Sequence, residues 1–104
     1  MTTTAPTVDR ALLQLLADPV RAQLVALLAK EQLCTCHLVE ATGASQSNVS
    51  NHLRALRQAG LVASEPAGRF TWYRLLPEPL EALGEAMALL AEQARTAAAV
   101  KRPC

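Results

Sequence analysis

Residues 43–62 constrain the fold more than any other segment of this chain. Gly43 suits the left-handed end of a short preceding helix, and Ser45 suits the N-cap of the next one. Apolar residues then recur at helical spacing as far as Gln58, and Gly60 ends the helix. A short helix, a tight turn and a longer helix that leads into a strand together predict a helix-turn-helix unit.

The outer face of the longer helix carries short polar side chains and no acidic residue. A helix that enters the DNA major groove needs such donors and acceptors, whereas ordinary solvated faces are rich in Glu and Lys. His52 either contacts phosphate or caps a polar cluster, and Arg69 suits a hairpin tip that reaches phosphate or the minor groove. We expect DNA contacts from Ser45, Gln46, Ser47, Asn48, Ser50, Asn51, His52, Arg54, Arg57 and Arg69.

The remaining elements predict a winged helix-turn-helix fold, mainly α with a small β-hairpin wing. The first and last helices carry apolar surface that a small core cannot cover, so we expect a homodimer through these two helices. Asp9 caps the first helix, and Asp18 with Pro19 starts the second. The expected helices cover about 10–17, 19–30, 36–42, 46–58 and 77–100, and the expected strands cover 61–65 and 70–75, around a turn at 66–69.

Length and charge limit the kind of protein. At 104 residues the chain is one domain, which we divide into a disordered leader (1–8), a DNA-binding and dimerisation domain (9–100) and a tail (101–104). Residues 45–74 carry four arginines against one glutamate, whereas residues 77–95 carry four glutamates against one arginine. The basic middle segment therefore favours double-stranded DNA as a partner.

No apolar run approaches the roughly 20 residues that span a bilayer. The N-terminus also lacks the basic and then apolar pattern of a signal peptide. We therefore expect a cytoplasmic protein with no membrane partner.

Two of the three cysteines, Cys34 and Cys36, lie one residue apart at the start of the third expected helix. Thiolate sulfur favours soft ions such as Zn, Cd, Cu(I) and As(III). Residues i and i+2 point about 200° apart on a regular helix. The two thiols can therefore hold one ion only from an irregular turn, or after the first helical turn unwinds. The helix dipole near this N-terminus also favours the thiolate.

Four segments together resemble the ArsR/SmtB family of metal-sensing repressors. They are LADPVR at 16–21, LCTCHL at 33–38, SQSNVSNHL at 45–53 and AGLV at 59–62, and the resemblance covers about residues 9–100. It implies a homodimeric winged helix-turn-helix repressor, with arsenical resistance as its setting, that leaves its operator when an inducer binds.

The thiol segment resembles the arsenic- and cadmium-sensing branches of this family. Arsenic-type members often carry a third cysteine at the position of Val39, and cadmium-type members use N-terminal cysteines that residues 1–33 lack. The zinc-type site needs a histidine that the last helix lacks. Our hypothesis is that Cys34, Cys36 and Cys104 bind As(III) or Sb(III) as three thiolates, with Cys104 from the same or a second chain.

Other interpretations remain open at this point. A repressor that senses Cd, Pb or Zn through the same thiols is one, and a thiol redox-sensing repressor is another. We expect no enzyme, organic cofactor or small organic substrate, because the chain has no Cys-x-x-Cys, phosphate-cradling loop or βαβ order. His37 is interpreted as a surface or capping residue and not as a ligand.

Overall fold

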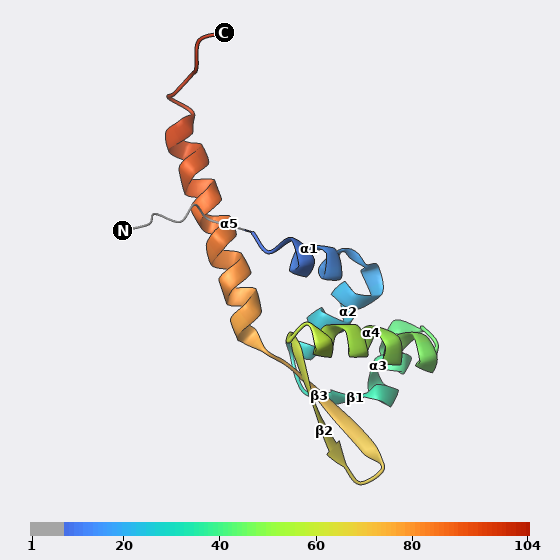
Figure 1. The fold of residues 1–104 in the computed structure, drawn as a ribbon. Coiled ribbons are helices and arrows are strands. Elements are labelled where there is room, and N and C mark those ends of the chain that lie inside the picture. The colour runs from blue at the N-terminus through green and yellow to red at the C-terminus, as the bar shows by residue number, and fades with distance from the viewer. Residues whose placement is uncertain (1–7) are drawn as a thin grey trace.

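The structure is a computed structural model that describes residues 8–104, and its elements follow the winged helix-turn-helix order (Figure 1). The predicted leader therefore lies, apart from Val8, outside the described residues. A mainly helical chain with a small hairpin confirms the predicted fold class. The elements are α1 (Arg10–Ala17), α2 (Pro19–Leu28), β1 (Leu33–Cys34), α3 (Thr35–Thr42), α4 (Gln46–Gln58), β2 (Val62–Ala67), β3 (Phe70–Leu75) and α5 (Pro77–Ala97).

The predicted capping residues fix where the helices begin. The side chains of Asp9, Asp18 and Ser45 accept backbone N–H groups in the first turns of α1, α2 and α4. Each such N-cap typically stabilises a helix by about 1 kcal/mol relative to alanine. Gly43 ends α3 at a φ of 71°, in the left-handed region that glycine adopts without a steric penalty. These residues confirm the predicted turn between α3 and α4.

The sheet has a third strand that the sequence did not predict. Its order is β1-β3-β2, all antiparallel, with Leu33 opposite Tyr73 and Cys34 opposite Trp72. A two-residue strand is too short to show an alternating pattern, so no sequence signal marked it. This strand holds Cys34, one of the two neighbouring thiols, against the hairpin.

The hairpin turn is shorter than predicted. β2 continues through Pro66, which lies opposite Thr71, and leaves Gly68 and Arg69 to make the turn. Proline is tolerated here because β2 is an edge strand, in which only alternate N–H groups face a neighbouring strand. Gly68 adopts a φ of 62°.

Three predicted helix ends shift by one to three residues. α2 ends at Leu28, since the N–H of Lys30 bonds to the carbonyl of Leu27 in a tighter last turn. α3 begins at Thr35, one residue earlier than predicted, directly after the short β1 strand. α5 ends at Ala97, after which the backbone again makes tighter hydrogen bonds.

The core is aliphatic and lies where α1 to α4 meet the base of the sheet. Burying one such leucine typically contributes about 1.5–3 kcal/mol. The buried core residues are Leu12, Leu24, Leu28, Leu38, Val49, Leu53, Leu56, Leu61, Val62 and Leu83. Nine of these ten lie between α1 and β2, so α1 to β3 (residues 10–75, here called the winged unit) holds nearly the whole core.

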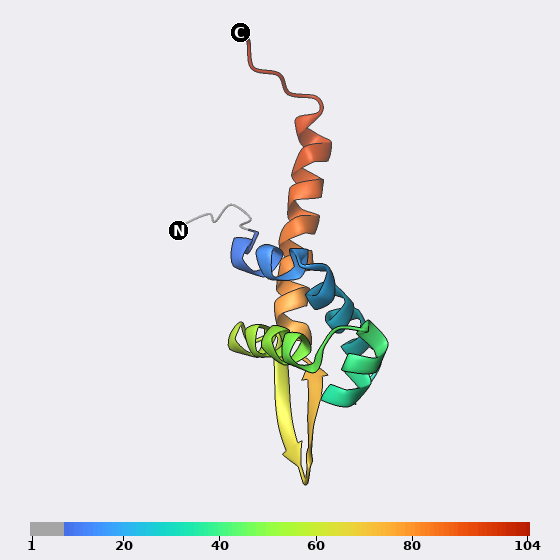
Figure 2. The ribbon, with the colours of Figure 1, turned by 90° about the vertical axis from the view of Figure 1, so that its right-hand side faces the viewer.

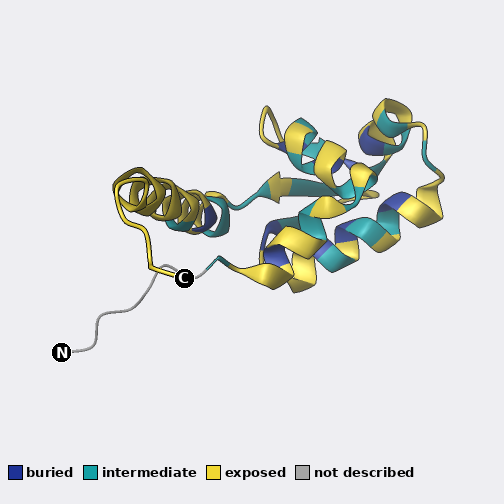
Figure 3. Cartoon of the chain, turned by 90° about the horizontal axis from the view of Figure 1, so that it is seen from above, coloured by how far each residue is buried: buried dark blue, intermediate teal, exposed yellow. Residues whose placement is uncertain are grey.

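α5 leaves the winged unit and runs away from the hairpin (Figures 1 and 2). Its outer turns are exposed along their whole surface (Figure 3). Leu83 is the one buried residue of α5, whereas Met87, Leu89 and Leu90 are 50%, 51% and 42% exposed. The apolar surface expected on this helix is therefore present, and beyond Leu83 this apolar stripe is uncovered within one chain. Dimerisation through it remains a prediction.

Within residues 8–104, no single helix is both long and apolar enough to cross a membrane. α1 and α2 meet that criterion only when counted together, and a bend of 97° separates them. Both helices contribute residues to the core described above.

Candidate metal centre and DNA interface

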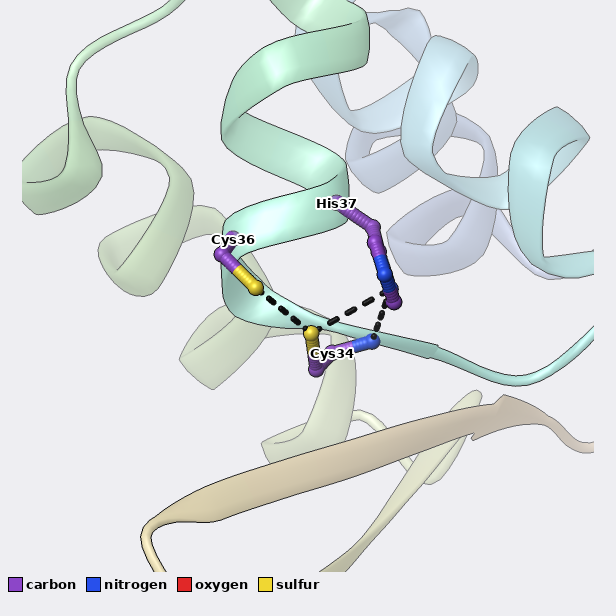
Figure 4. Close-up of side chains that lie close together, drawn as sticks. All are labelled: Cys34, Cys36 and His37. Atoms are coloured by element: carbon purple, nitrogen blue, oxygen red, sulfur yellow. Dashed lines mark hydrogen bonds between the residues drawn. The ribbon is translucent and has the colours of Figure 1, made fainter.

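The two neighbouring thiols meet at the turn from β1 into α3. Cys34 ends the strand and is the N-cap of α3, with φ −90° and ψ 168°, while Cys36 lies in the first helical turn. Because Cys34 has extended backbone, its side chain does not follow the roughly 200° separation of a regular helix. The two Sγ atoms lie 2.8 Å apart (Figure 4). Of the two arrangements expected from the sequence, the structure has the irregular turn.

His37 completes a three-residue cluster with these thiols. Its Nδ1 accepts the backbone N–H of Cys34 at 3.3 Å and lies 3.2 Å from the Cys34 Sγ (Figure 4). The ring packs against Trp72, with centroids 5.9 Å apart. The interpretation of His37 as a capping residue agrees with these contacts. One of its ring nitrogens and the two sulfurs all lie within 4.8 Å of one another.

The two thiols differ in acidity. A hydrogen bond from the Cys36 thiol, helped by backbone N–H groups at the start of α3, lowers the pKa of Cys34. The same hydrogen bond raises the pKa of Cys36, because its proton is held by the neighbouring sulfur. Cys34 is therefore the first of the pair to become a thiolate as the pH rises. Cys34 is buried and Cys36 is exposed, so Cys36 is the more accessible sulfur of the pair.

A cavity of about 360 Å³ opens beside the thiol pair. It joins three parts of the fold: the start of α3, the first residue of α4 and the tip of the hairpin. Its lining residues are Cys34, Thr35, Cys36, Gln46, Arg69, Phe70 and Thr71. Gln46 and Arg69 are predicted DNA contacts, so the thiol site and the predicted DNA surface share a wall.

The third cysteine lies far from this pair within one chain. Cys104 is exposed at the end of the tail beyond α5, and the C-terminus is at the opposite end of the molecule from the hairpin (Figures 1 and 2). The structure thus brings Cys34 and Cys36 together and does not bring Cys104 to them in the same chain.

The predicted DNA face is presented to solvent. Two of its arginines are held by neighbours: Arg54 donates to Asn51 at 3.4 Å and Arg57 donates to Ser64 at 3.3 Å. Ser50 and His52 are half-buried. The exposed members of the set are Ser45, Gln46, Ser47, Asn48, Asn51, Arg54, Arg57 and Arg69. Their contact with DNA remains a prediction.

His52 points to a polar cluster at the corner between α1 and α2. Its Nδ1 lies 3.2 Å from a guanidinium nitrogen of Arg21, and its Nε2 lies 3.8 Å from the Asp18 carboxylate. The backbone N–H of Arg21, first among several contacts, lowers the pKa of Asp18. The His52 ring thus lies in a polar cluster, and its contact with phosphate stays a prediction.

Comparison with known proteins identifies the fold and the family. Residues 18–64 match the family model "Bacterial regulatory protein, arsR family". A crystal structure described as a possible transcriptional regulator for arsenical resistance superposes with a TM-score of 0.69 and 36% identity. That match covers 86% of this chain and 96% of the other.

Two curated relatives match about three fifths of this chain. The arsenic resistance transcriptional regulator ArsR1 of Pseudomonas putida is 44% identical over 64 residues, which are 61% of this chain and 50% of that protein. A transcriptional repressor SmtB homolog of Synechocystis is 45% identical over 60 residues, 58% of this chain and 46% of that protein. The chain thus spans about half the length of these relatives, which are regulators and not enzymes. On the family model and the long structural match, this chain belongs to the arsR family of bacterial regulatory proteins.

Proposed function

We propose that this protein is a transcriptional repressor that binds operator DNA and releases it when As(III) or Sb(III) binds its cysteine thiolates. The observation that carries the proposal is the convergence of the Cys34 and Cys36 sulfurs, 2.8 Å apart, directly beside the helix-turn-helix. Family membership and relatives named for arsenic resistance support it. A cytoplasmic location and a DNA-binding and dimerisation domain at 9–100 belong to the same proposal.

The DNA-bound form is a homodimer that presents two α4 helices to successive major grooves, about 34 Å apart on B-DNA. Short polar side chains on α4 contact base edges, while Arg54, Arg57 and the hairpin residue Arg69 contact phosphates. The exposed leucines and methionine of α5, with Leu13 of α1, form the dimer contact. A two-fold dimer matches the two-fold symmetry of a palindromic operator.

The inducer bridges the thiol pair. As(III) is soft and takes three thiolates in a pyramid, so Cys34 and Cys36 leave one position open. We propose that Cys104 fills it from a second copy of the chain, because Cys104 of the same chain lies at the far end of α5. Inducer binding would then also depend on dimer geometry.

Binding changes the start of α3 for a geometric reason. Two thiolates about 2.3 Å from one ion lie roughly 3.3 Å apart at the near-right angle of a pyramid and roughly 3.8 Å apart at a tetrahedral angle, so either kind of ion pushes apart sulfurs that now lie 2.8 Å from each other. The backbone N–H of Cys34 is capped by His37, and movement of Cys34 breaks that cap. Gln46 of α4 and Arg69 of the hairpin line the same cavity as the two thiols. A shift of Cys34 therefore changes the positions of α4 and the hairpin.

A divalent ion is the second candidate inducer. A ring nitrogen of His37 lies within 4.8 Å of both sulfurs, which gives two sulfurs and one imidazole from a single chain. This donor set suits Zn or Cd better than As(III), since imidazole is a good ligand for borderline divalent ions. A fourth ligand would have to come from solvent or a second copy.

Titration of an operator complex against arsenite, antimonite, Cd and Zn tests the proposal. Release by arsenite or antimonite that weakens in Cys104→Ser but survives in His37→Ala supports the three-thiolate site. Release by Cd or Zn that weakens in His37→Ala supports the divalent alternative. Release by an oxidant and by none of the ions would make the thiols a redox switch, and absence of any specific DNA binding would overturn the repressor function.

A further inference from the structure

We propose that His52 positions the recognition helix α4 through a polar joint with Arg21 and Asp18, which links α4 to α1, the helix of the proposed dimer contact. The inference rests on the proposed function, since it concerns how the two α4 helices of a dimer are held at operator spacing. It assigns His52 a role through protein contacts in place of a contact with DNA.

The joint ties three helices at one point. Arg21, in α2, donates its Nε to the carbonyl of Leu15 in α1 and places a second guanidinium nitrogen 3.2 Å from the Nδ1 of His52 in α4. Asp18, between α1 and α2, accepts the N–H groups of Val20 and Arg21 at 2.9 and 3.1 Å. Every polar group of the joint thus connects two elements or caps one.

The Arg21 side chain fixes the form of the His52 ring. A guanidinium has donors and no acceptor, so the Nδ1 that faces it must accept and cannot carry a proton. The neutral ring then holds its proton on Nε2, which faces the Asp18 carboxylate at 3.8 Å. The Arg21 contact is within hydrogen-bond range, whereas the Asp18 contact is longer and purely electrostatic.

The joint supplies a directional restraint that the core does not. α4 packs through Val49, Leu53 and Leu56, and such apolar contacts are non-directional. Rotation of α4 about its own axis is opposed by hydrogen bonds, which depend on direction. His52, with 16% of its side chain exposed, lies on the flank of α4 between the buried face and the outer polar face.

This placement gives the joint a consequence for the dimer. Leu13 of α1 is 41% exposed and belongs to the proposed dimer contact, and α1 meets α2 at a bend of 97° where Asp18 lies. A shift of α1 at the dimer interface is therefore passed through Arg21 and His52 to α4. Because both α4 helices must fit grooves at a fixed separation, a small rotation weakens both contacts at once.

Two conservative variants separate the two contacts of the ring. In His52→Asn the amide group occupies the place of Nδ1 and accepts from Arg21, whereas His52→Gln places its amide near Nε2 and faces Asp18. We expect His52→Ala to weaken operator binding by about tenfold or more, from the loss of a hydrogen bond to a charged group. His52→Asn should recover most of this loss and His52→Gln little of it.

DNA of random sequence provides the readout that separates positioning from direct contact. Under the proposal, His52→Ala leaves random-sequence affinity and its salt dependence unchanged, and combining it with Arg21→Gln adds little further loss of operator affinity. If His52 contacts phosphate instead, the salt slope falls by about one, binding weakens across sequences, and the two substitutions add. That result would overturn the inference.

A measurement without DNA keeps this test separate from the repressor function. Nitrogen-15 NMR of the His52 ring in the wild-type protein should show a bare Nδ1 and a protonated Nε2, and Arg21→Gln should change the Nδ1 signal. A proton on Nδ1 would refute the joint even if operator binding is normal. A joint confirmed by NMR in a protein that binds no operator would refute the repressor function alone.

Discussion

The winged unit and α5 differ in how much of their apolar surface a single chain buries. The winged unit buries nine of the ten core residues, caps its helices and brings two thiols together. α5 buries one residue, exposes three large apolar side chains and leads to a tail that carries the third thiol. The comparison suggests that folding and the thiol pair belong to one chain, whereas dimer geometry and the third thiolate require a second.

Matched leucine truncations in the two regions should give the largest difference. Leu56→Ala removes a fully buried side chain from the winged unit and should lower the free energy of unfolding by about 2–5 kcal/mol. Leu89→Ala removes a side chain that is 51% exposed in one chain. The free energy of unfolding that Leu89→Ala removes, measured in urea, should be small at low protein concentration and should grow with protein concentration. Equal losses at every concentration would contradict the comparison.

A charge in the apolar stripe of α5 should separate association from folding. Leu90 is 42% exposed in one chain, so a two-fold contact that covers it in both chains contributes about 1–3 kcal/mol, and Leu90→Glu should raise the dimer dissociation constant roughly 10- to 100-fold. Sedimentation equilibrium measures this change, and circular dichroism should show unchanged helix content. Glu92→Gln is the matched control, since it changes an exposed residue that is paired with Arg95. An unchanged dimer in Leu90→Glu would place the contact elsewhere.

The thiol pair should titrate as two unequal groups. The Cys36 thiol lowers the pKa of Cys34, so thiolate absorbance should appear at lower pH in the wild type than in Cys36→Ala. Inducer affinity of the wild type follows the thiolate and should fall as the pH drops through the lowered Cys34 pKa. Cys104→Ala is the control. If Cys36→Ala titrates like the wild type, the hydrogen bond between the two sulfurs is absent in solution.

Asp18 should give the smallest effect, as a dependence of stability on pH. Its folded-state pKa is lowered below the ordinary value for an aspartate, so the stabilisation is present above that ordinary value and is lost as pH falls through the folded-state pKa. Asp18→Asn keeps an N-cap residue of similar quality and removes the charge. Its unfolding free energy should therefore vary less with pH below about 4 than that of the wild type, in thermal melts at several pH values.

The parts of the fold that the sequence predicted are those whose structure depends on residues close together in the chain. Asp9, Asp18, Ser45 and Gly43 act on their own backbone neighbours, so their roles follow from residue type and position. The two-residue β1 strand forms through pairing with β3, which lies far later in the chain, and no local pattern reports it. For the same reason the sequence predicted the convergence of Cys34 and Cys36 only as one of two alternatives.

The site was predictable in residue type and less so in geometry. The Cys-x-Cys spacing identified the thiol pair, but the extended backbone that turns both sulfurs together depends on the strand pairing of Cys34. His37 was predicted as a cap, and its proximity to both sulfurs follows from that capping role. Likewise, the partners of His52 lie in distant parts of the sequence, beyond any helical spacing.

A mixed dimer tests most directly whether a second chain supplies the third thiolate of the proposed arsenic site. One chain carries Cys34→Ser with Cys36→Ser and keeps Cys104, and the other carries Cys104→Ser and keeps the thiol pair. We predict that X-ray absorption at the arsenic edge will show three sulfurs around arsenite in the mixed dimer, and fewer in either parent homodimer. A mixed dimer that shows no more sulfurs than its parents would contradict the account.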